Sequence, residues 1–267
     1  MNSNKKCVIV LMTDFGLNDT YVGQMKGVIL SICPETRIVD LTHAVEPQNI
    51  VHGAFLLGKS FRYFPEKTIF VSVVDPGVGT SRRPIAIETS RNIFIGPDNG
   101  LFTPILEQEE IIRCVHIMEK RFMLPQQSST FHGRDLFSPV AAHLASGISL
   151  KETGAEIDPS DCQRIEMPAC KSPDNGKSWE GSIIYADHFG NLITSLDSDM
   201  IGNPEQWMVI AGNLDPLSIS ETYGCAENKQ PLACTGSSGM IEIAVRNGNA
   251  AESLNLANGD KVRLAGK

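Results

Sequence analysis

Residues 68–83 read Thr68-Ile-Phe-Val-Ser-Val-Val-Asp-Pro-Gly-Val-Gly-Thr-Ser-Arg-Arg83. The stretch opens with a mostly apolar, β-branched run, which is typical of a strand buried on both faces of a sheet. The strand then ends at Asp75, and the residues Asp75-Pro-Gly77 turn the chain. Ligands of open α/β sheets bind beyond the carboxyl ends of the strands. The stretch therefore predicts an α/β fold with a candidate site at Asp75. Taken alone, however, Asp-Pro-Gly favours a plain turn whose aspartate caps its own backbone and whose arginines are solvated.

Strand and helix patterns alternate on both sides of this stretch. Pro47 suits the first turn of a helix that carries apolar residues up to Leu57. Further strands are predicted at residues 7–12, 37–42, 84–89, 92–95 and 111–117, and further helices at residues 21–32 and 136–146. This alternation predicts an N-terminal α/β domain over residues 1–160, sandwich-like, with helices packed on a central sheet.

The character of the sequence changes after this domain. Residues 161–176 belong to a polar stretch rich in proline and glycine, which predicts a linker. Short strands then recur at residues 181–186, 192–196, 207–211, 240–245 and 261–264, separated by Asn, Gly and Asp turns. This spacing predicts that residues 177–267 form a smaller β domain, either a barrel or a sandwich.

Composition excludes several classes of function. The 267-residue chain has a formal net charge of −8, which argues against nucleic acid as a partner, and no apolar run is long enough to span a membrane. Its seven cysteines include no Cys-x-x-Cys pair and its histidines no metal-ligand spacing, so we expect no metal site and reduced thiols in a cytoplasm. The N-terminal Met1–Lys6 is basic, but a first strand follows it, so we expect no signal peptide. Glycine motifs for dinucleotides or triphosphates are absent.

Polar residues collect at the predicted ends of elements. For His132, which precedes a helix, a capping or hydrogen-bonding role is an equal alternative to catalysis. The loop Gly236-Ser-Ser-Gly239 could offer donors to a ligand carboxylate or be a plain hairpin turn. The candidates are Asp14, Asp75, Arg82, His132, Asp187, Asn191, Ser237 and Ser238.

Five motifs occur in one order along nearly the whole chain. They are Thr13-Asp-Phe-Gly16, Val74-Asp-Pro-Gly-Val-Gly-Thr-Ser-Arg-Arg83, Gly96-Pro-Asp-Asn-Gly100, Phe131-His-Gly-Arg-Asp-Leu-Phe137 and Asp187-His-Phe-Gly-Asn191. Together they closely resemble the S-adenosyl-L-methionine (SAM) hydrolase (adenosine-forming) family, also called SAM hydroxide adenosyltransferases, which is related to the fluorinases and chlorinases.

The resemblance implies roles for individual residues. It implies a water-activating triad of Asp75, Arg82 and His132, and a ribose-binding role for Asp14. The methionine part of SAM would be held by Asp187, Phe189 and Asn191 together with Ser237 and Ser238, and adenine by residues near Asn249 and Ala250. The halogenating relatives lack the triad, so its presence here favours water as the nucleophile.

The chemistry is consistent with those residue types. The sulfonium of SAM is already a good leaving group, whereas water, with a pKa of about 15.7, attacks saturated carbon poorly. A carboxylate, a guanidinium and an imidazole can orient one water and accept its proton. Either Asp75 or His132 could be the acceptor. Asp14 can bind both ribose hydroxyls and so place C5′ in line with the water.

We therefore predict hydrolysis of SAM to adenosine and L-methionine, with no cofactor beyond the substrate. The resemblance also implies a homotrimer with sites between subunits. Two alternatives stay open: a SAM-dependent 5′-halogenase, and a non-catalytic sensor that binds SAM or adenosine.

Overall fold

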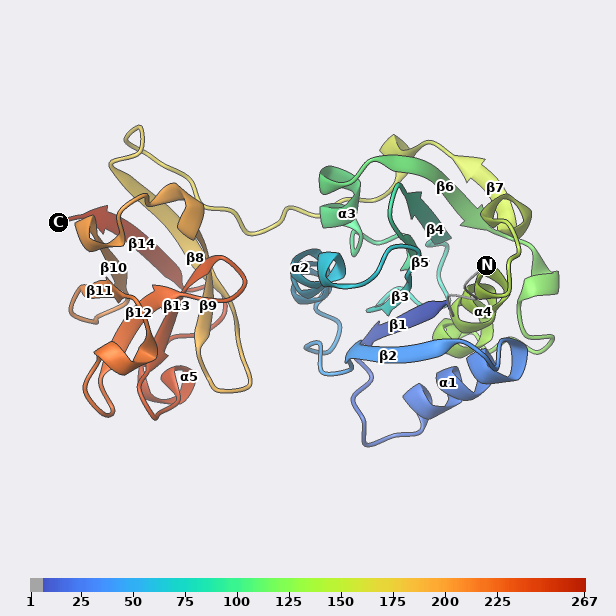
Figure 1. Cartoon of the computed structure of the whole chain (residues 1–267), viewed down its shortest axis with the longest axis horizontal. Coiled ribbons are helices and arrows are strands. Elements are labelled where there is room, and N and C mark those ends of the chain that lie inside the picture. The colour runs from blue at the N-terminus through green and yellow to red at the C-terminus, as the bar shows by residue number, and fades with distance from the viewer. Residues whose placement is uncertain (1–6) are drawn as a thin grey trace, which may run out of the picture. The chain divides into compact units, whose positions relative to one another are not determined.

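The computed structural model describes residues 7–267 and contains two compact units, one ending at Met167 and one beginning at Pro168 (Figure 1). The prediction about a signal peptide falls on Met1–Lys6, outside the described residues. Across residues 7–267, no helix has both the length and the apolar character needed to cross a membrane.

The first unit is built on a seven-stranded sheet with the order β2-β1-β3-β5-β4-β6-β7. The strands are β1 (Val8–Thr13), β2 (Arg37–Thr42), β3 (Ile69–Val73), β4 (Pro84–Thr89), β5 (Ile93–Pro97), β6 (Ile111–Ile117) and β7 (Gly154–Ile157). Strands β2, β1, β3 and β5 pair in parallel, whereas β4, β6 and β7 add antiparallel pairs. The carboxyl ends of β1, β3 and β5 consequently meet at one edge of the sheet.

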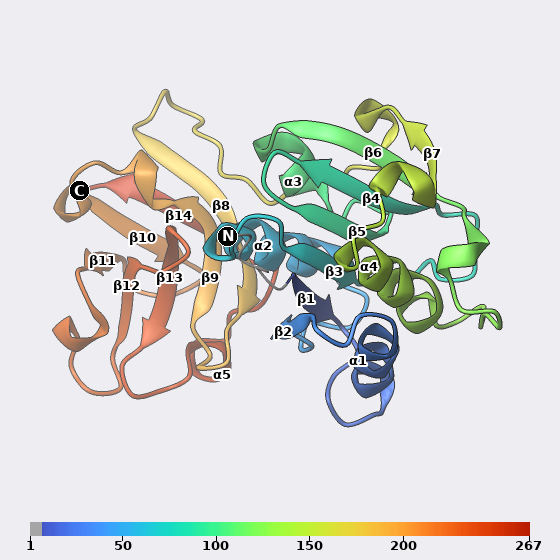
Figure 2. The ribbon, with the colours of Figure 1, turned by 45° about the vertical axis from the view of Figure 1, so that its right-hand side comes forward.

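Helices cover both faces of this sheet. They are α1 (Tyr21–Ile32), α2 (Ile50–Ser60), α3 (Thr103–Gln108) and α4 (Ser138–Ala145). Side chains alternate along β1, so Ile9 and Leu11 pack with α1 and α4 while Val10 and Met12 pack with α2 and α3. Figure 2 shows α1 and α4 side by side, as Figure 1 does. Burial on both faces explains the continuous apolar runs in the sequence.

The second unit is a closed barrel with the strand order β10-β11-β12-β13-β9-β8-β14, in which β14 also pairs with β10. Its elements are β8 (Ser178–Ala186), β9 (Leu192–Asp197), β10 (Trp207–Ala211), β11 (Leu217–Ser220), β12 (Pro231–Thr235), β13 (Met240–Val245), the short helix α5 (Ala250–Ser253) and β14 (Lys261–Gly266). Leucine, isoleucine, valine and alanine side chains fill its interior. The predicted fold is confirmed: an α/β unit with a central sheet, followed by a β-barrel.

Some local predictions were wrong. Pro47 does not enter a helix, because α2 begins at Ile50 with Asn49 as its cap. The helix predicted from residue 136 is preceded by a π-helical turn, Gly133–Phe137, so the helical path starts earlier than the apolar pattern indicates. Strands β7, β11 and β12 were not predicted, since they are short and hold few of the residues that favour strands.

Short helical turns complete the chain. The 3₁₀ turns are Phe61–Tyr63, Lys120–Phe122, Leu150–Thr153, Pro159–Asp161, Ser198–Met200, Pro204–Gln206 and Tyr223–Cys225. After Pro159–Asp161, residues of the expected linker pack on the first unit: Cys162 is buried, and Ile165 and Met167 pack beside it. The backbone N–H of Gln163 donates to Asp98 at 2.7 Å.

Candidate active site

The carboxyl edge of the first sheet gathers polar groups from neighbouring strands. Thr13, the last residue of β1, pairs with Val73, the last residue of β3, so Asp14 and Asp75 follow adjacent strand ends. One carboxylate oxygen of Asp14 accepts the backbone N–H of Gln48 at 2.8 Å. This bond fixes the Asp14 side chain and leaves its other oxygen for a further donor.

Arg82 connects Asp75 and His132. Its Nε donates to both carboxylate oxygens of Asp75 at 3.0 Å, and its Nη2 also donates to that carboxylate. The same Nη2 lies 2.6 Å from Nδ1 of His132. The side chains of Arg82 and Asp75 are only 9% and 4% exposed, so the pair is largely desolvated. The structure thus brings together the three residues for which the family resemblance implies a catalytic role.

The arginine determines the protonation of His132. A guanidinium can only donate, so Nδ1 of the imidazole must accept, and the proton of the neutral ring lies on Nε2. Burial lowers the pKa of His132 below its ordinary value, and the nearby Arg82 charge acts in the same direction. Asp75 and Asp135 oppose this shift. His132 is therefore neutral near pH 7 and presents an Nε2–H donor.

The turn of residues 75–82, called here the Asp75–Arg82 turn, is shaped by its own contacts. Gly79 has a φ of +79°, and a Cβ at this position would lie 2.6 Å from the carbonyl oxygen of Ser129. Asn99 donates its side-chain amide to the carbonyl of Val74 at 2.9 Å and so holds the chain just before Asp75. Only glycine fits at position 79, because both the backbone conformation and the close approach exclude a side chain.

The two consecutive arginines have different partners. Arg82 bonds Asp75, whereas Arg83 donates to Asp98 at 2.9 Å through Nε. The guanidinium of Arg82 also lies over the Phe137 ring, 5.4 Å from its centroid. Of the two, Arg82 belongs to the site and Arg83 braces the edge of the sheet.

In the barrel, Asp187 organises the turn of residues 187–191 between β8 and β9. Its Oδ1 accepts the backbone N–H groups of Phe189 at 2.9 Å and Asn191 at 2.8 Å. Its Oδ2 accepts the Asn191 side-chain amide at 3.0 Å. The Phe189 ring is 72% exposed. The turn thus exposes the Phe189 ring, and the Asp187 carboxylate holds the backbone of the turn.

Asn249 and Ala250 lie against this turn. Asn249 accepts the backbone N–H of Glu252 at 3.1 Å and caps α5, and its side chain packs on Gly190. The N–H of Ala251 donates to the Gly190 carbonyl at 3.0 Å. Ala250 is fully buried in the barrel core.

The two serines lie at the other end of β13. Ser237 and Ser238 occupy the turn between β12 and β13, whereas Asn249 follows the far end of β13. Six strand residues separate the two groups, a span of roughly 20 Å. The barrel therefore brings Asp187, Asn191 and Asn249 together and holds the serines apart from them.

Two residues that support candidate groups or their surroundings escaped the sequence analysis. Asn99 supports the strand end before Asp75, and its only signal was its place in the motif Gly96-Pro-Asp-Asn-Gly100. On the barrel, the buried Glu242 accepts a hydrogen bond from Tyr223 and lies against Gly236. Nothing in the local pattern marks Glu242, because it sits inside an apolar strand whose partners come from distant segments.

The fold and the triad define a class: an α/β domain followed by a β-barrel, with a desolvated carboxylate–arginine–histidine set suited to orienting water. Residues 9–154 match the SAM hydroxide adenosyltransferase N-terminal domain, and residues 181–263 match the SAM hydroxide adenosyltransferase C-terminal domain. The chain belongs to the SAM hydroxide adenosyltransferase family, which confirms the resemblance found in its motifs.

Similar proteins cover almost all of the chain. A protein of Thermus thermophilus named (R)-S-adenosyl-L-methionine hydrolase is 36% identical over 264 residues, covering 96% of this chain and 98% of that protein. A fluorinase of Actinopolyspora mzabensis is 29% identical, with 98% of each chain covered. A crystal structure of an uncharacterized conserved protein from Thermotoga maritima superposes with a TM-score of 0.88 at 32% identity, covering 96% of this chain and 100% of that one.

Proposed function

We propose that this protein is a hydrolase that splits SAM into adenosine and L-methionine. The water oxygen forms a bond to C5′ while the bond from C5′ to sulfur breaks, and the sulfonium leaves as the neutral thioether of methionine. The water gives up one proton. The observation that carries the proposal is the single Arg82 guanidinium that bonds both Asp75 and His132 at the carboxyl edge of the sheet. The names of relatives such as the Thermus protein support the choice of SAM.

The hydrogen bonds assign parts to the triad. Because Arg82 occupies Nδ1 of His132, the imidazole offers Nε2–H to the water and orients it. Asp75 is then the remaining base of the triad, and it takes the proton as attack proceeds. Arg82 stays charged throughout and stabilises the hydroxide-like oxygen. Of the two groups, Asp75 therefore receives the proton and His132 orients the water.

The other predicted residues bind the substrate. Asp14 keeps an oxygen available for the ribose hydroxyls, since the N–H of Gln48 engages only Oδ2. Phe189 offers an exposed ring, and the turn of residues 187–191 would hold the methionine part. Ser237 and Ser238 lie at the other end of β13 and would not reach the group that this turn holds. Asn249 and the segment that leads to Ala250 would meet the adenine.

The wider setting follows from the same proposal. The protein would act on a small molecule in the cytoplasm, as a homotrimer with sites between subunits, and without nucleic acid or membrane as a partner. It would need no cofactor, because the positive sulfur of SAM already makes methionine a good leaving group.

A labelled-water experiment tests the proposal. Incubating the protein with SAM in oxygen-labelled water should place the label on the 5′ hydroxyl of adenosine, as read by mass spectrometry. Parallel reactions with added chloride or fluoride should give the same product. A 5′-halo nucleoside as the main product would establish a halogenase instead, and calorimetric SAM binding without turnover would establish a sensor.

A further inference from the structure

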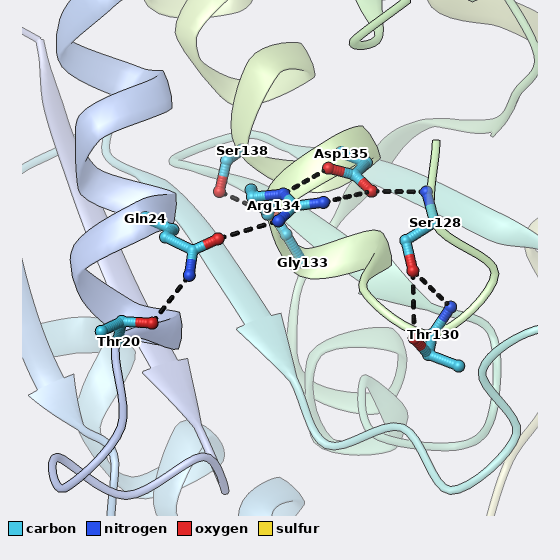
Figure 3. Close-up of polar contacts among 8 residues, drawn as sticks. All are labelled: Thr20, Gln24, Ser128, Thr130, Gly133, Arg134, Asp135 and Ser138. Carbon is cyan, nitrogen blue, oxygen red and sulfur yellow. Dashed lines mark hydrogen bonds and ion pairs between the residues drawn. The ribbon is translucent and has the colours of Figure 1, made fainter. Parts of the chain in front are cut away.

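A second charged pair lies next to His132. Asp135 is fully buried, and its carboxylate accepts Arg134 Nε at 2.6 Å and Arg134 Nη2 at 3.1 Å. Figure 3 shows this fork between neighbouring residues. A buried carboxylate is costly unless it is paired and hydrogen-bonded. The presence of this buried charged pair is explained by the other contacts of Asp135 and Arg134.

Asp135 holds the loop of residues 124–131, which leads to His132. Its Oδ2 accepts the backbone N–H of Ser128 at 2.7 Å, and its own carbonyl accepts the N–H of Leu124 at 2.9 Å. The hydroxyl of Ser128 in turn accepts the N–H of Thr130 at 3.2 Å (Figure 3). One residue thus fixes two points of this loop.

The loop lies directly on the Asp75–Arg82 turn. The carbonyl oxygen of Ser129 occupies the space that a side chain at Gly79 would need. Ser129 is the neighbour of Ser128, whose N–H Asp135 holds. The position of the loop therefore bears on the turn that carries Asp75 and Arg82.

Arg134 extends the pair toward the start of α1. Its Nη1 donates to Gln24 at 2.8 Å, and the Gln24 amide donates to Thr20 at 2.7 Å (Figure 3). The guanidinium also lies 4.9 Å from the centroid of the Phe131 ring, which packs edge-on against Phe15, the neighbour of Asp14.

The backbone around His132 is held on both sides. The carbonyl of Phe131 accepts the N–H groups of Arg134 at 3.2 Å and Asp135 at 3.1 Å. The carbonyl of Gly133 accepts the hydroxyl of Ser138 at 2.7 Å (Figure 3). His132 consequently has little freedom to move away from Arg82.

We propose that Asp135 is a positioning residue which, paired with Arg134, sets the distance between His132 and the Asp75–Arg82 turn. It touches neither the substrate nor the water and acts through the two segments it holds. The inference rests on the proposed function, since it assigns the pair to the alignment of the same water.

The test compares Asp135→Asn with the wild type. The asparagine can still accept from Ser128 but loses the charged fork with Arg134. We expect kcat for SAM to fall about 100-fold, the effect of a misplacement near 1 Å, with little change in KM. The charged groups facing His132 are Arg82, Asp75 and Asp135. Because Asp135 raises the pKa of His132, its neutralisation should move the NMR titration of the His132 ring to lower pH.

A matched control is Glu109→Gln. Glu109 forms a pair with Arg62 at 3.0 Å, beyond the end of α3, in which the carboxylate is 9% exposed and the arginine 56% exposed. Its loss should leave kcat and the His132 titration unchanged. If Asp135→Asn keeps its kcat, or raises KM with kcat unchanged, the inference is overturned. The same holds if its activity returns fully at a lower temperature where the variant is stable.

Gln24→Leu gives a second, milder variant on the surface of α1. It removes the acceptor of Arg134 Nη1 and should lower kcat several-fold without changing KM, and an unchanged kcat would count against the inference. The NMR titration requires no turnover. If the wild type fails to hydrolyse SAM, the proposed function fails, while the titration still shows whether Asp135 acts on His132.

Discussion

Arg82 is the residue on which the candidate site depends, because its guanidinium bonds a carboxylate and an imidazole at once. A lysine ammonium at this position could not reproduce the planar fork toward Asp75. Burial strengthens these bonds, since water does not compete with them. The triad is therefore one hydrogen-bonded unit, and its members should act together in any measurement.

At this scale, we predict that catalysis and binding separate. His132→Ala and Asp75→Ala should each lower kcat roughly 100- to 10,000-fold, because each removes a group that acts on the water. SAM affinity should change little, since interactions used only in the transition state leave ground-state binding alone. Single-turnover rates beside calorimetric SAM binding provide the measurement.

The double variant sharpens this prediction. Groups that act as a unit are non-additive, so His132→Ala with Asp75→Ala should be scarcely slower than either single variant. Rate losses that multiply, or a wild-type rate with both groups removed, would show that the three residues do not work as a triad.

At the scale of elements, loops between strands carry the candidate groups and glycines set their shape. Gly190 has a φ of +82° in the turn of residues 187–191, and its Cα faces the Asn249 side chain. Two segments far apart in the sequence thus approach at a point where a side chain has no room. This contact couples the candidate methionine-binding turn to the candidate adenine-binding segment.

We therefore predict that Gly190→Ala weakens SAM binding as well as stability. The positive φ costs about 1–2 kcal/mol for any residue with a Cβ, and displacement of Asn249 should weaken SAM binding about tenfold, or about 1.4 kcal/mol. Gly259→Ala is the control, because Gly259 has a φ of +88° and open space around it. Equal SAM affinity of the two variants, by calorimetry, would contradict a role for the Gly190–Asn249 contact.

At the scale of the whole molecule, four histidines couple folding to pH. Burial lowers the pKa values of His52, His116, His132 and His143 below the ordinary value, which is about 6.5. Between the folded and unfolded pKa values, the unfolded chain binds more protons, so stability rises with pH in that window. Acidification from about pH 7 toward pH 5 should accordingly destabilise the protein.

Thermal unfolding at a series of pH values measures this effect. Tm should fall as pH drops through about 6.5, by about 2–4 °C for each kcal/mol lost. His143→Gln removes one of the four groups and should flatten the dependence. A Tm that rises on acidification in this window would refute the assignment of these histidines as neutral in the folded protein.

Much of the architecture is local and was therefore predictable from the sequence. Helix α1 has the predicted bounds, and β2, β4 and β6 match their predicted ranges, because hydrophobic periodicity is decided by near neighbours. The order of five motifs identified the family. The candidate residues Asp14 and Asp75 could be placed at strand ends because a buried strand has a clear last residue.

Only the tertiary structure decided how these pieces meet. Closure of the barrel pairs β10 with β14, which lie some fifty residues apart in the sequence. The contact between Arg82 and His132 joins residues that are 50 positions apart. The bond between Arg82 and His132, the protonated nitrogen of the His132 ring and the bond from Arg134 to Gln24 all depend on such long-range contacts. Local sequence patterns do not reveal such contacts, because a hydrogen bond between distant segments changes neither the hydrophobic period nor the composition of either segment.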